Sequence, residues 1–267
     1  VRAVFDLVSL ESSLAGSIYA GKLNYAPVTD STNSDALTAA RSGAAHGTVF
    51  LVDEQTAGRG RGGHSWLSAA GDGLYVSVLL RLAVPAERIL LLPLAVGLAA
   101  AQATDEVTGL AVDIRWPNDL LIGPLKAGGI LVEARNDSKE PAHAVVVAGI
   151  GINVHQRGFP EDLATPATSL DIATGRRVSR QALLVALLRA LEREAGSVAV
   201  AELAKRVPAR VEAASSWVRG RRVEVHGPQA CTGTTAGLDA NGFLRVATAG
   251  GLVTIQTGGI REAAPSL

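Results

Sequence analysis

The segment best suited to chemistry is a loop rich in glycine and arginine, Gly58-Arg59-Gly60-Arg61-Gly62-Gly63-His64-Ser65-Trp66. Guanidinium groups bind phosphate and carboxylate oxygens through paired hydrogen bonds, and glycines let backbone N–H groups approach the same ligand. Such a loop cannot bury apolar surface, so it would be mobile until an anion ordered it. We predict a closable anion-binding loop. A solvated loop, or an Arg-Gly segment of an RNA-binding protein, is the alternative.

A dinucleotide-binding role fits this loop poorly. Gly58, Gly60 and Gly63 formally satisfy the G-x-G-x-x-G pattern, and a predicted strand precedes them. His-Ser-Trp and a second glycine-rich stretch, 69–73, follow in place of the apolar helix that would face a pyrophosphate. No G-x-x-x-x-G-K-[ST] motif occurs in the sequence, which excludes a P-loop.

A second group of residues surrounds a predicted turn, Trp116-Pro117-Asn118-Asp119-Leu120. Pro117 ends a strand there, and the next two residues present an amide and a carboxylate, as a phosphate-facing or oxygen-ligand site requires. Lys126 enters the returning strand, and Gly128-Gly129 leave no side chain between that strand and a ligand. A lysine held there would place positive charge where a pentavalent phosphorus or an attacking carboxylate accumulates negative charge. Taken singly, these residues are an exposed lysine and an ordinary turn.

A third candidate is the run Gly149-Ile150-Gly151-Ile152-Asn153. Glycines at alternate positions leave one face of a strand bare, and Asn153 adds a polar group among apolar neighbours. A bulge with a hydrogen-bonded core asparagine would produce the same pattern. The five histidines have no metal-ligand spacing, and neither G-x-S-x-G nor H-E-x-x-H occurs.

The elements that must position these motifs follow from apolar periodicity and from helix start and stop residues. Predicted helices are 34–41, 86–108 and the amphipathic 180–194, and predicted strands are 48–52, 74–82, 112–116 and 144–154. Residues 120–122 and 129–134 form a predicted hairpin around Gly123-Pro124. We expect an α+β fold over residues 1–214, a mixed, mostly antiparallel sheet with flanking helices.

After Trp217 the sequence changes to short β runs separated by glycine-containing turns. These runs are 222–225, 232–238, 244–247 and 252–256. Closely spaced short strands predict a small SH3-like β-barrel, so we place a second domain at residues 215–267.

Composition limits the class of protein. Among 267 residues, 48% are hydrophobic, and 25 Lys and Arg balance 25 Asp and Glu, which argues against disorder and against coating of nucleic acid by bulk charge. A single cysteine, Cys231, excludes an intramolecular disulfide and fits a reducing compartment. No signal peptide is visible, and the apolar run 89–104, which contains Pro93, is shorter than the roughly 18 to 20 residues that span a bilayer. We expect a cytoplasmic protein without membrane contact.

In order and approximate spacing, these motifs together resemble those of the biotin protein ligases. The quoted set is Asp30-Ser31-Thr32-Asn33, then Glu54-Gln55-Thr56-Ala57-Gly58-Arg59-Gly60-Arg61 with Trp66, then Trp-Pro-Asn-Asp-Leu, Lys126 with Gly-Gly-Ile-Leu-Val-Glu, and Gly-Ile-Gly-Ile-Asn. The resemblance covers about residues 25–155 by motif, and reaches the end of the chain through the small β domain. Each motif alone is weak, and the set is specific.

The resemblance implies a two-step reaction. Biotin's carboxylate attacks ATP to give biotinyl-5′-AMP and pyrophosphate, with Mg²⁺, and a lysine of a biotin carboxyl carrier domain of an acyl-CoA carboxylase then takes the biotin. Both steps build charge beside a phosphate or acyl oxygen, so positioning and fixed positive charge should matter most. A monomer or weak homodimer is expected. Carrier domains of this kind tend to be acidic, and residues 176–222 carry a net charge of +7, so this stretch is a candidate docking or steering surface.

The resemblance also implies roles for individual residues. Lys126, Arg59 and Arg61 would be catalytic, and Asp119 would serve the Mg²⁺ side. The expected biotin-binding residues are Ser31, Thr32, Gln55, Gly58, Arg59, Lys126 and Gly129. The expected ATP- and adenylate-binding residues are Arg61, His64, Trp66, Asn118, Lys126 and Asn153.

Two departures from the family pattern affect these expectations. His64 stands where the family often has another arginine, so the loop would carry less fixed charge near neutral pH. About 25 residues precede the first motif, too few for the winged helix with which longer members bind operator DNA, so we expect a ligase that binds no DNA and is not a transcriptional repressor. A lipoate-type ligase, with the same adenylation logic and a different acid pocket, and an RNA-binding protein that uses the Arg-Gly loop are the alternatives.

Overall fold

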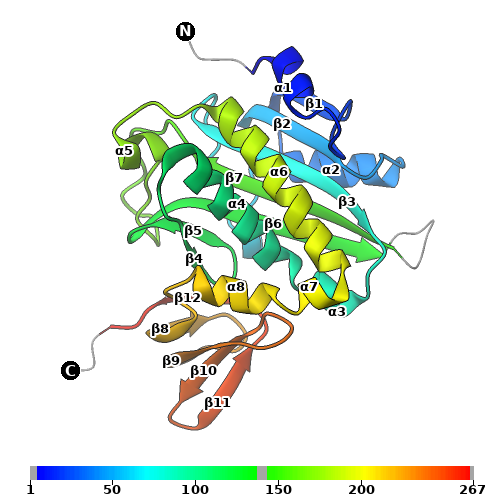
Figure 1. The fold of residues 1–267 in the computed structure, drawn as a ribbon. Helices are drawn as coiled ribbons and strands as arrows, with labels where there is room; N and C mark the ends of the chain where they lie inside the picture. The colour runs from blue at the N-terminus through cyan, green and yellow to red at the C-terminus, as the bar shows by residue number, and fades with distance from the viewer. Residues whose placement is uncertain (1–4, 137–142, 265–267) are drawn as a thin grey trace.

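A seven-stranded mixed sheet forms the centre of the computed structural model, which describes residues 5–136 and 143–264 (Figure 1). Its strands are β1 Leu23–Thr29, β2 Thr48–Gln55, β3 Gly73–Leu82, β4 Asp113–Arg115, β5 Asp119–Ile122, β6 Leu125–Asn136 and β7 Ala144–Asn153. They lie in the order β1-β2-β3-β7-β6-β5-β4, and β1 and β2 are its parallel pair. The predicted mixed, mostly antiparallel sheet is confirmed.

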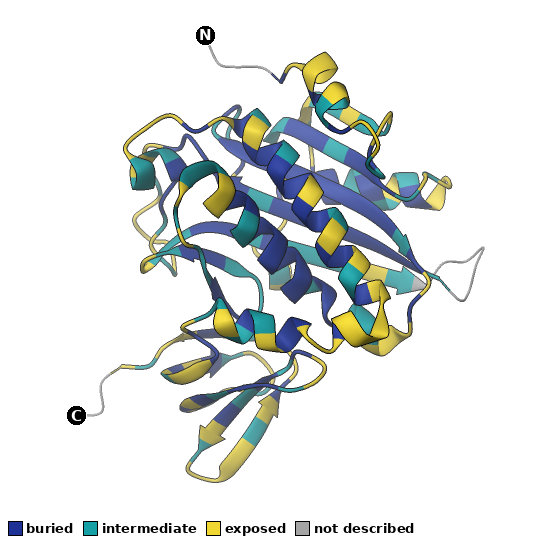
Figure 2. Ribbon diagram, in the orientation of Figure 1, coloured by how far each residue is buried: buried dark blue, intermediate teal, exposed yellow. Residues whose placement is uncertain are grey.

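Burial on both faces explains the apolar sequences of the central strands. On one face, alternate residues Leu74, Val76 and Val78 of β3 join the main core. On the other face, Leu79 packs with Val147 of β7 in a smaller core under the helix at Thr32–Arg41. The middle of the sheet is accordingly dark blue in Figure 2.

Helices cover both faces of this sheet. They are α1 Leu7–Ser13, α2 Thr32–Arg41, α3 Ala86–Ile89, α4 Leu92–Thr108, α5 Leu170–Thr174, α6 Arg180–Ala199, α7 Ala201–Ala204 and α8 Val207–Ala213, with a short 3₁₀ turn, η1, at Arg61–Gly63. α4 and α6 lie side by side across one face, and α2 packs on the opposite face (Figure 1). The sequence did not predict β1, α1, α5, α7 and α8, nor the last strand at residues 259–262, which are short or lack a strong apolar period.

The predicted helix 86–108 is two helices. A break at residues 90–91 separates α3 from α4, and Pro93 lies in the first turn of α4, where a missing N–H is tolerated. By length and composition the joined segment could cross a membrane, but 56% of its most apolar window is buried inside the fold. α4 packs as a core helix against the sheet and against α6 beside it, and the sequence predicted a buried helix here.

The C-terminal part is a five-stranded antiparallel sheet. Its strands are β8 Arg219–His226, β9 Cys231–Leu238, β10 Leu244–Thr248, β11 Gly251–Ile255 and β12 Gly259–Glu262, in the order β11-β10-β9-β8-β12. In the described residues no pairing joins β11 to β12, so the hydrogen bonding does not close a barrel. This sheet shares the main core, and buried Trp116 donates from Nε1 to the oxygen of Gly242 at 3.0 Å.

Candidate active site

A cavity of about 950 Å³ opens between the two sheets. Its walls come from the start of α2, the 59–67 loop, the β5–β6 hairpin, β7, the 156–167 connection and two turns of the C-terminal sheet, 226–228 and 257–261. A volume of this size is typical of a site for small-molecule substrates.

The cavity brings together all but one of the site residues expected from the sequence. Those that line it are Ser31, Thr32, Gln55, Arg59, Arg61, His64, Trp66, Asn118, Asp119, Lys126, Gly129 and Asn153. Gly58 does not line it. Gly58 is buried, and a Cβ there would lie 2.4 Å from the oxygen of Trp66, so this glycine lets the two ends of the loop meet. Trp66 N donates to the Gly58 oxygen at 2.8 Å.

The start of α2 forms a polar end of the cavity. Thr32 donates from N and from Oγ1 to Gln55 Oε1, at 2.9 and 3.1 Å, and Gln55 Nε2 donates to Ser68 Oγ at 2.8 Å. Ser31 is buried at the N-cap of α2 without a side-chain hydrogen bond to the helix. Its hydroxyl is therefore available to a ligand with polar edges.

Three polar residues not predicted from the sequence extend this network under the sheet. Ser77 Oγ donates to Asn33 Oδ1 at 2.6 Å, and Asn33 Nδ2 donates to Glu133 Oε2 at 2.9 Å. The bare strand face at Gly149 exists to admit this amide, because a Cβ there would lie 2.0 Å from Asn33 Oδ1. A charged residue inside the apolar run Ile-Leu-Val-Glu was the sequence signal that could have identified Glu133.

Gly129 and Gly151 lack a side chain where the indole ring of Trp66 packs against the sheet. A Cβ at Gly151 would lie 2.5 Å from Nε1 of Trp66, and one at Gly129 would lie 3.2 Å from Cζ3. Nε1 is buried and, among the described residues, finds no hydrogen-bond partner. The indole thus lies against the sheet with a donor still to be satisfied, and Lys126 Nζ lies 5.4 Å from the ring centre.

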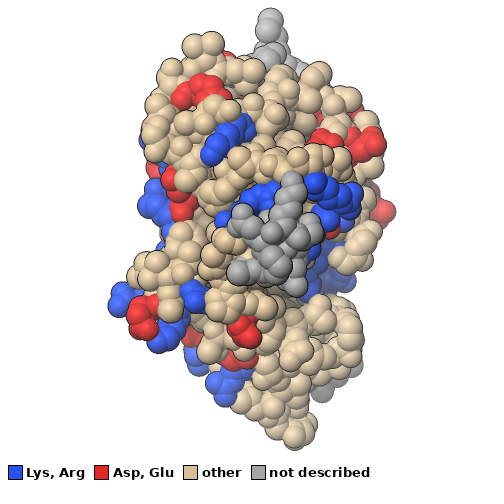
Figure 3. Space-filling view, turned by 90° about the vertical axis from the view of Figure 1, so that its right-hand side faces the viewer, with Lys and Arg blue, Asp and Glu red and all other residues tan. Residues whose placement is uncertain are grey.

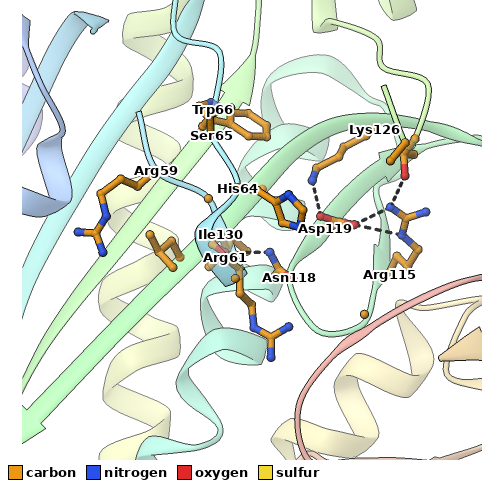
Figure 4. A pocket seen from close by; sticks show the side chains of 18 of the residues that line it. Arg59, Arg61, His64, Ser65, Trp66, Arg115, Asn118, Asp119, Lys126 and Ile130 are labelled. Atoms are coloured by element: carbon orange, nitrogen blue, oxygen red, sulfur yellow. Dashed lines mark hydrogen bonds and ion pairs between the residues drawn. The ribbon is translucent and has the colours of Figure 1, made fainter. Parts of the chain in front are cut away.

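A cluster of charges occupies the β4–β6 side of the cavity (Figure 4). Asp119 accepts from Lys126 through Oδ1 at 2.6 Å, and from Arg115 Nη2 through Oδ2 at 2.6 Å. Burial alone would raise the pKa of Asp119, but Lys126 and Arg115 outweigh it and hold this pKa below its usual value. Asp119 is therefore an anion shared by two cations. The sequence did not predict Arg115, although a cation just before Trp-Pro-Asn-Asp was visible.

Both loop arginines point away from this cluster (Figure 4). Arg59 Nη2 pairs with Glu133 Oε1 at 2.7 Å. Arg61 Nη2 donates to Thr257 Oγ1 at 2.8 Å, and Nη1 donates to the Gly258 oxygen in the β11–β12 turn. Burial lowers the pKa of Arg61, and Asp119 partly opposes that shift. The three expected catalytic cations thus share one cavity without contacting one another.

The other expected residues make structural contacts. Asn118 Nδ2 donates to the oxygen of Ile130 at 3.1 Å and fastens the hairpin. Asn153 Nδ2 donates to the oxygen of Thr168 at 3.0 Å, and His64 closes the loop because its oxygen accepts from Gly60 N at 2.6 Å.

The donor set does not fit a magnesium ion held directly by the protein. Both oxygens of Asp119 already face a cation, at 2.6 Å each. Within residues 5–136 and 143–264, no group of three or more His, Cys, Asp or Glu side chains could hold a metal. Mg²⁺ prefers several oxygen ligands, which a nucleotide triphosphate can supply.

Comparison with known proteins gives this geometry a context. Residues 25–153 match the biotin/lipoate A/B protein ligase family. The biotin–[acetyl-CoA-carboxylase] ligase of Mycobacterium tuberculosis is 33% identical over 267 residues, which cover 97% of this chain and 96% of that protein. The bifunctional ligase/repressor BirA of Bacillus subtilis is 38% identical over 173 residues, 64% of this chain and 53% of BirA, so the match spans about half of that relative's length.

A solved structure agrees with these relatives. The biotin protein ligase from Aquifex aeolicus, in complex with biotin and ATP, has a TM-score of 0.77 and 31% sequence identity, over 91% of this chain and all of that one. Sequence similarity along nearly the whole chain, the family match and the shared fold lead to one conclusion: the chain belongs to the biotin/lipoate A/B protein ligase family, among the biotin protein ligases.

Proposed function

We propose that this chain is a biotin protein ligase that makes biotinyl-5′-AMP and pyrophosphate from biotin and ATP, and then transfers biotin to a lysine of a biotin carboxyl carrier domain. The name of the M. tuberculosis relative and the ligands of the A. aeolicus structure support these substrates. The observation that carries the proposal is one cavity with a polar end at Thr32 and Gln55 and a cationic cluster around Lys126.

The first step needs positive charge at one place. A carboxylate oxygen of biotin bonds to the α-phosphorus of ATP, and the bond from that phosphorus to pyrophosphate breaks. Negative charge grows on the phosphoryl oxygens meanwhile, and Lys126, held at 2.6 Å from Asp119, supplies fixed positive charge there. Ser31, Thr32 and Gln55 hold the ureido ring at the polar end, and Gly129 lets the backbone approach the ligand.

The loop arginines act by exchanging partners. Arg59 exchanges the Glu133 carboxylate, and Arg61 its neutral acceptors at Thr257 and Gly258, for the biotin carboxylate and the multiply charged triphosphate, whose oxygens accept paired, charge-assisted hydrogen bonds. The 58–66 loop then closes over the intermediate and excludes water. Trp66 and Asn153 contact the adenine, with His64 and Asn118 on the nucleotide side. Because both oxygens of Asp119 face a cation, the triphosphate would hold Mg²⁺ as part of the ATP substrate.

The second step transfers the acyl group. The neutral amine of the carrier lysine attacks the carbonyl of the mixed anhydride, an amide bond forms, AMP leaves with the electron pair of the broken C–O bond, and the amine nitrogen releases one proton to solvent. The same cations stabilise the oxygens of the leaving phosphate.

The proposal also covers domain organisation, cellular location, oligomeric state and partner. We place the domain boundary between residues 214 and 215, just after α8, and assign the C-terminal sheet to an SH3-like barrel in which β11 and β12 are not hydrogen-bonded to each other in the described residues. A cytoplasmic monomer or weak homodimer is proposed, with a carboxylase carrier domain as its partner. The family match does not favour the RNA-binding alternative.

A direct test uses mass spectrometry of a carrier domain after incubation with biotin, Mg-ATP and this protein. We expect one biotinyl group on the carrier, and pyrophosphate release that requires both biotin and ATP. Lys126→Ala abolishes both signals, whereas Lys205→Ala does not, because Lys205 pairs with Glu202 on an exposed surface. An unmodified carrier, or wild-type turnover by Lys126→Ala, contradicts the proposal.

The identity of the acid needs its own measurement, because the family includes lipoate ligases. Calorimetric titration with biotin and with lipoate, each with a non-hydrolysable ATP analogue, compares the two acids under the same conditions. We expect biotin to bind and lipoate to bind far more weakly. Binding of lipoate without binding of biotin overturns the choice of acid and leaves the adenylation chemistry in place.

A further inference from the structure

Arg115 binds Asp119, the carboxylate that in turn binds Lys126. The residue ends β4, and its side chain is 8% exposed. Its Nη2 and Nε lie 2.6 and 3.1 Å from Asp119 Oδ2, and Nη2 also donates to Thr165 Oγ1 at 2.8 Å. The guanidinium carbon lies 5.3 Å from the centre of a Trp217 ring. One neighbour across the hairpin, Asp119, and two from distant parts of the chain, Thr165 and Trp217, therefore fix this one guanidinium.

The strand geometry makes the arrangement stiff. Arg115 and Asp119 are paired across the β4–β5 hairpin, and β5 is paired in turn with β6, which carries Lys126. Asp119 Oδ1 is left for the ammonium of Lys126, at 2.6 Å. Arg115 donates to Oδ2 through both Nε and Nη2, so its planar guanidinium restricts the rotation of this carboxylate more than a single donor would. The position of Lys126 Nζ is thus set through Asp119 by Arg115.

The charges of this triad do not cancel. Two cations share one carboxylate, so the group carries a net charge of +1. Its most accessible member is Lys126, with a side chain 26% exposed against 16% for Asp119 and 8% for Arg115. The uncancelled charge therefore faces the cavity. Without Arg115, Asp119 would neutralise Lys126, and an arriving carboxylate or phosphate would meet a neutral ion pair.

We propose that Arg115 is a positioning residue for adenylation: it fixes Asp119, and through Asp119 the ammonium of Lys126, and keeps one positive charge available to the substrates. This inference rests on the proposed function of the site. It predicts that the guanidinium affects chemistry without touching substrate.

The test compares three variants by biotin-dependent exchange of pyrophosphate into ATP. Arg115→Met, which keeps length and removes charge, should lower kcat/KM by roughly 10- to 100-fold, the effect of one charged hydrogen bond, with kcat falling more than KM rises. Arg115→Lys, which restores charge without the fork, should recover KM and only part of kcat. Arg221→Met is the matched control, because Arg221 also stacks on Trp217, at 3.9 Å, and pairs with Glu262 away from the cavity. It should stay within about twofold of wild type.

A second measurement is independent of activity. The rate at which an amine-reactive reagent labels Lys126, read by peptide mass spectrometry, should fall in Arg115→Met and not in Arg221→Met, because Asp119 then pairs with Lys126 alone. Unchanged kcat/KM in folded Arg115→Met, or unchanged labelling, overturns the inference. Labelling that slows in a protein that consumes no biotin supports the geometry and rejects the proposed function. Should Arg115→Met fail to fold, Thr165→Val removes one anchor and should show a smaller loss of kcat.

Discussion

Gly149→Ala provides a sharp test of the packing beneath the site. The new methyl group would lie 2.0 Å from Oδ1 and 2.8 Å from Cγ of Asn33, well inside contact distance. Asn33 cannot move freely, because it is 4% exposed and its amide bonds to Ser77 Oγ and Glu133 Oε2, at 2.6 and 2.9 Å. The strand cannot move either, since β7 is paired on both sides in the middle of the sheet.

The cost follows from these contacts. Displacing Asn33 breaks its bond to the Glu133 carboxylate, worth about 1.5–3 kcal/mol, and its neutral bond to Ser77, worth about 1 kcal/mol. If the amide stays in place, overpacking costs about 1–3 kcal/mol. Because the folded protein adopts whichever response costs less, we expect Gly149→Ala to lower the free energy of unfolding by about 1–3 kcal/mol, a substantial fraction of a typical domain's stability. Because Glu133 also holds Arg59, the free loop should become more mobile.

Urea unfolding followed by circular dichroism measures this cost. Gly196→Ala is the control, because Gly196 lies exposed within α6 with no atom within 4 Å of its Cβ position, so alanine there should stabilise by about 0.5–1 kcal/mol. Adding Asn33→Ala to Gly149→Ala should recover part of the loss, because the clashing amide is removed. A Gly149→Ala protein as stable as wild type would refute the steric reasoning.

Three further predictions address pH, the loop and the charged surface. Burial lowers the pKa of His46, and the charge of Lys22 lowers it further, whereas Glu192 partly opposes the shift. His46 Nδ1 also accepts a hydrogen bond from Arg81 N. As the pH falls, the imidazole therefore takes up a proton in the unfolded chain before it does so in the folded chain. The stability that His46 contributes should therefore be fully present above about pH 6.5 and be lost as the pH drops below that value. The free energy of unfolding, measured by urea titration, should fall less steeply with pH in His46→Asn than in wild type. Equal slopes for the two proteins would contradict this. Trypsin cleavage after Arg59 and Arg61 should slow only with biotin and ATP together, and protection without ligand would indicate a rigid structural loop. Most cations of residues 176–222 already contact acids or carbonyl oxygens of this chain, for example Arg180 with Asp53 and Arg221 with Glu262, so raising salt from about 50 to 300 mM should slow carrier modification only about two- to fivefold, and no change removes the steering role.

The surface agrees with that modest expectation. On the face drawn in Figure 3, acidic and basic side chains are interspersed over both the upper and the lower part of the molecule. The net charge of +7 that the sequence assigns to residues 176–222 is spread over several elements, and acids outside that stretch partly neutralise it, such as Asp53 beside Arg180 and Glu262 beside Arg221. Charge counted along the chain overstates the field that a partner would meet.

Most of the central architecture was predictable. The strands around 48–52, 74–82 and 144–154 are buried on one or both faces, so their apolar and β-branched content is strong, and the structure confirms all three. β1, by contrast, is an edge strand with partly exposed residues and a proline, so its sequence gives only a weak strand signal. Its pairing with β2 stabilises the strand. α8 is seven residues long, too short for a periodic signal.

Residue chemistry located the cavity, because glycine, arginine and Trp-Pro-Asn-Asp are rare in these combinations. The partners of those residues were not predictable. Asn33 meets Glu133 from 100 residues away, and Arg61 meets Thr257 from 196 residues away. Local sequence patterns give no information about such contacts, because the contacts depend on how the sheet and the loop pack in the folded chain.

The sequence alone determined which strand positions lack side chains, which arginines and lysines could serve a site, and which family the motifs resemble. These properties depend on residue type and local spacing. Tertiary structure decided how the charges are used. It set Lys126 against Asp119, added Arg115 as a third member, and turned Arg59 and Arg61 toward Glu133 and the C-terminal sheet. The physical reason is that Coulomb and hydrogen-bond energies depend on separations of a few ångströms, and only the folded chain specifies those separations.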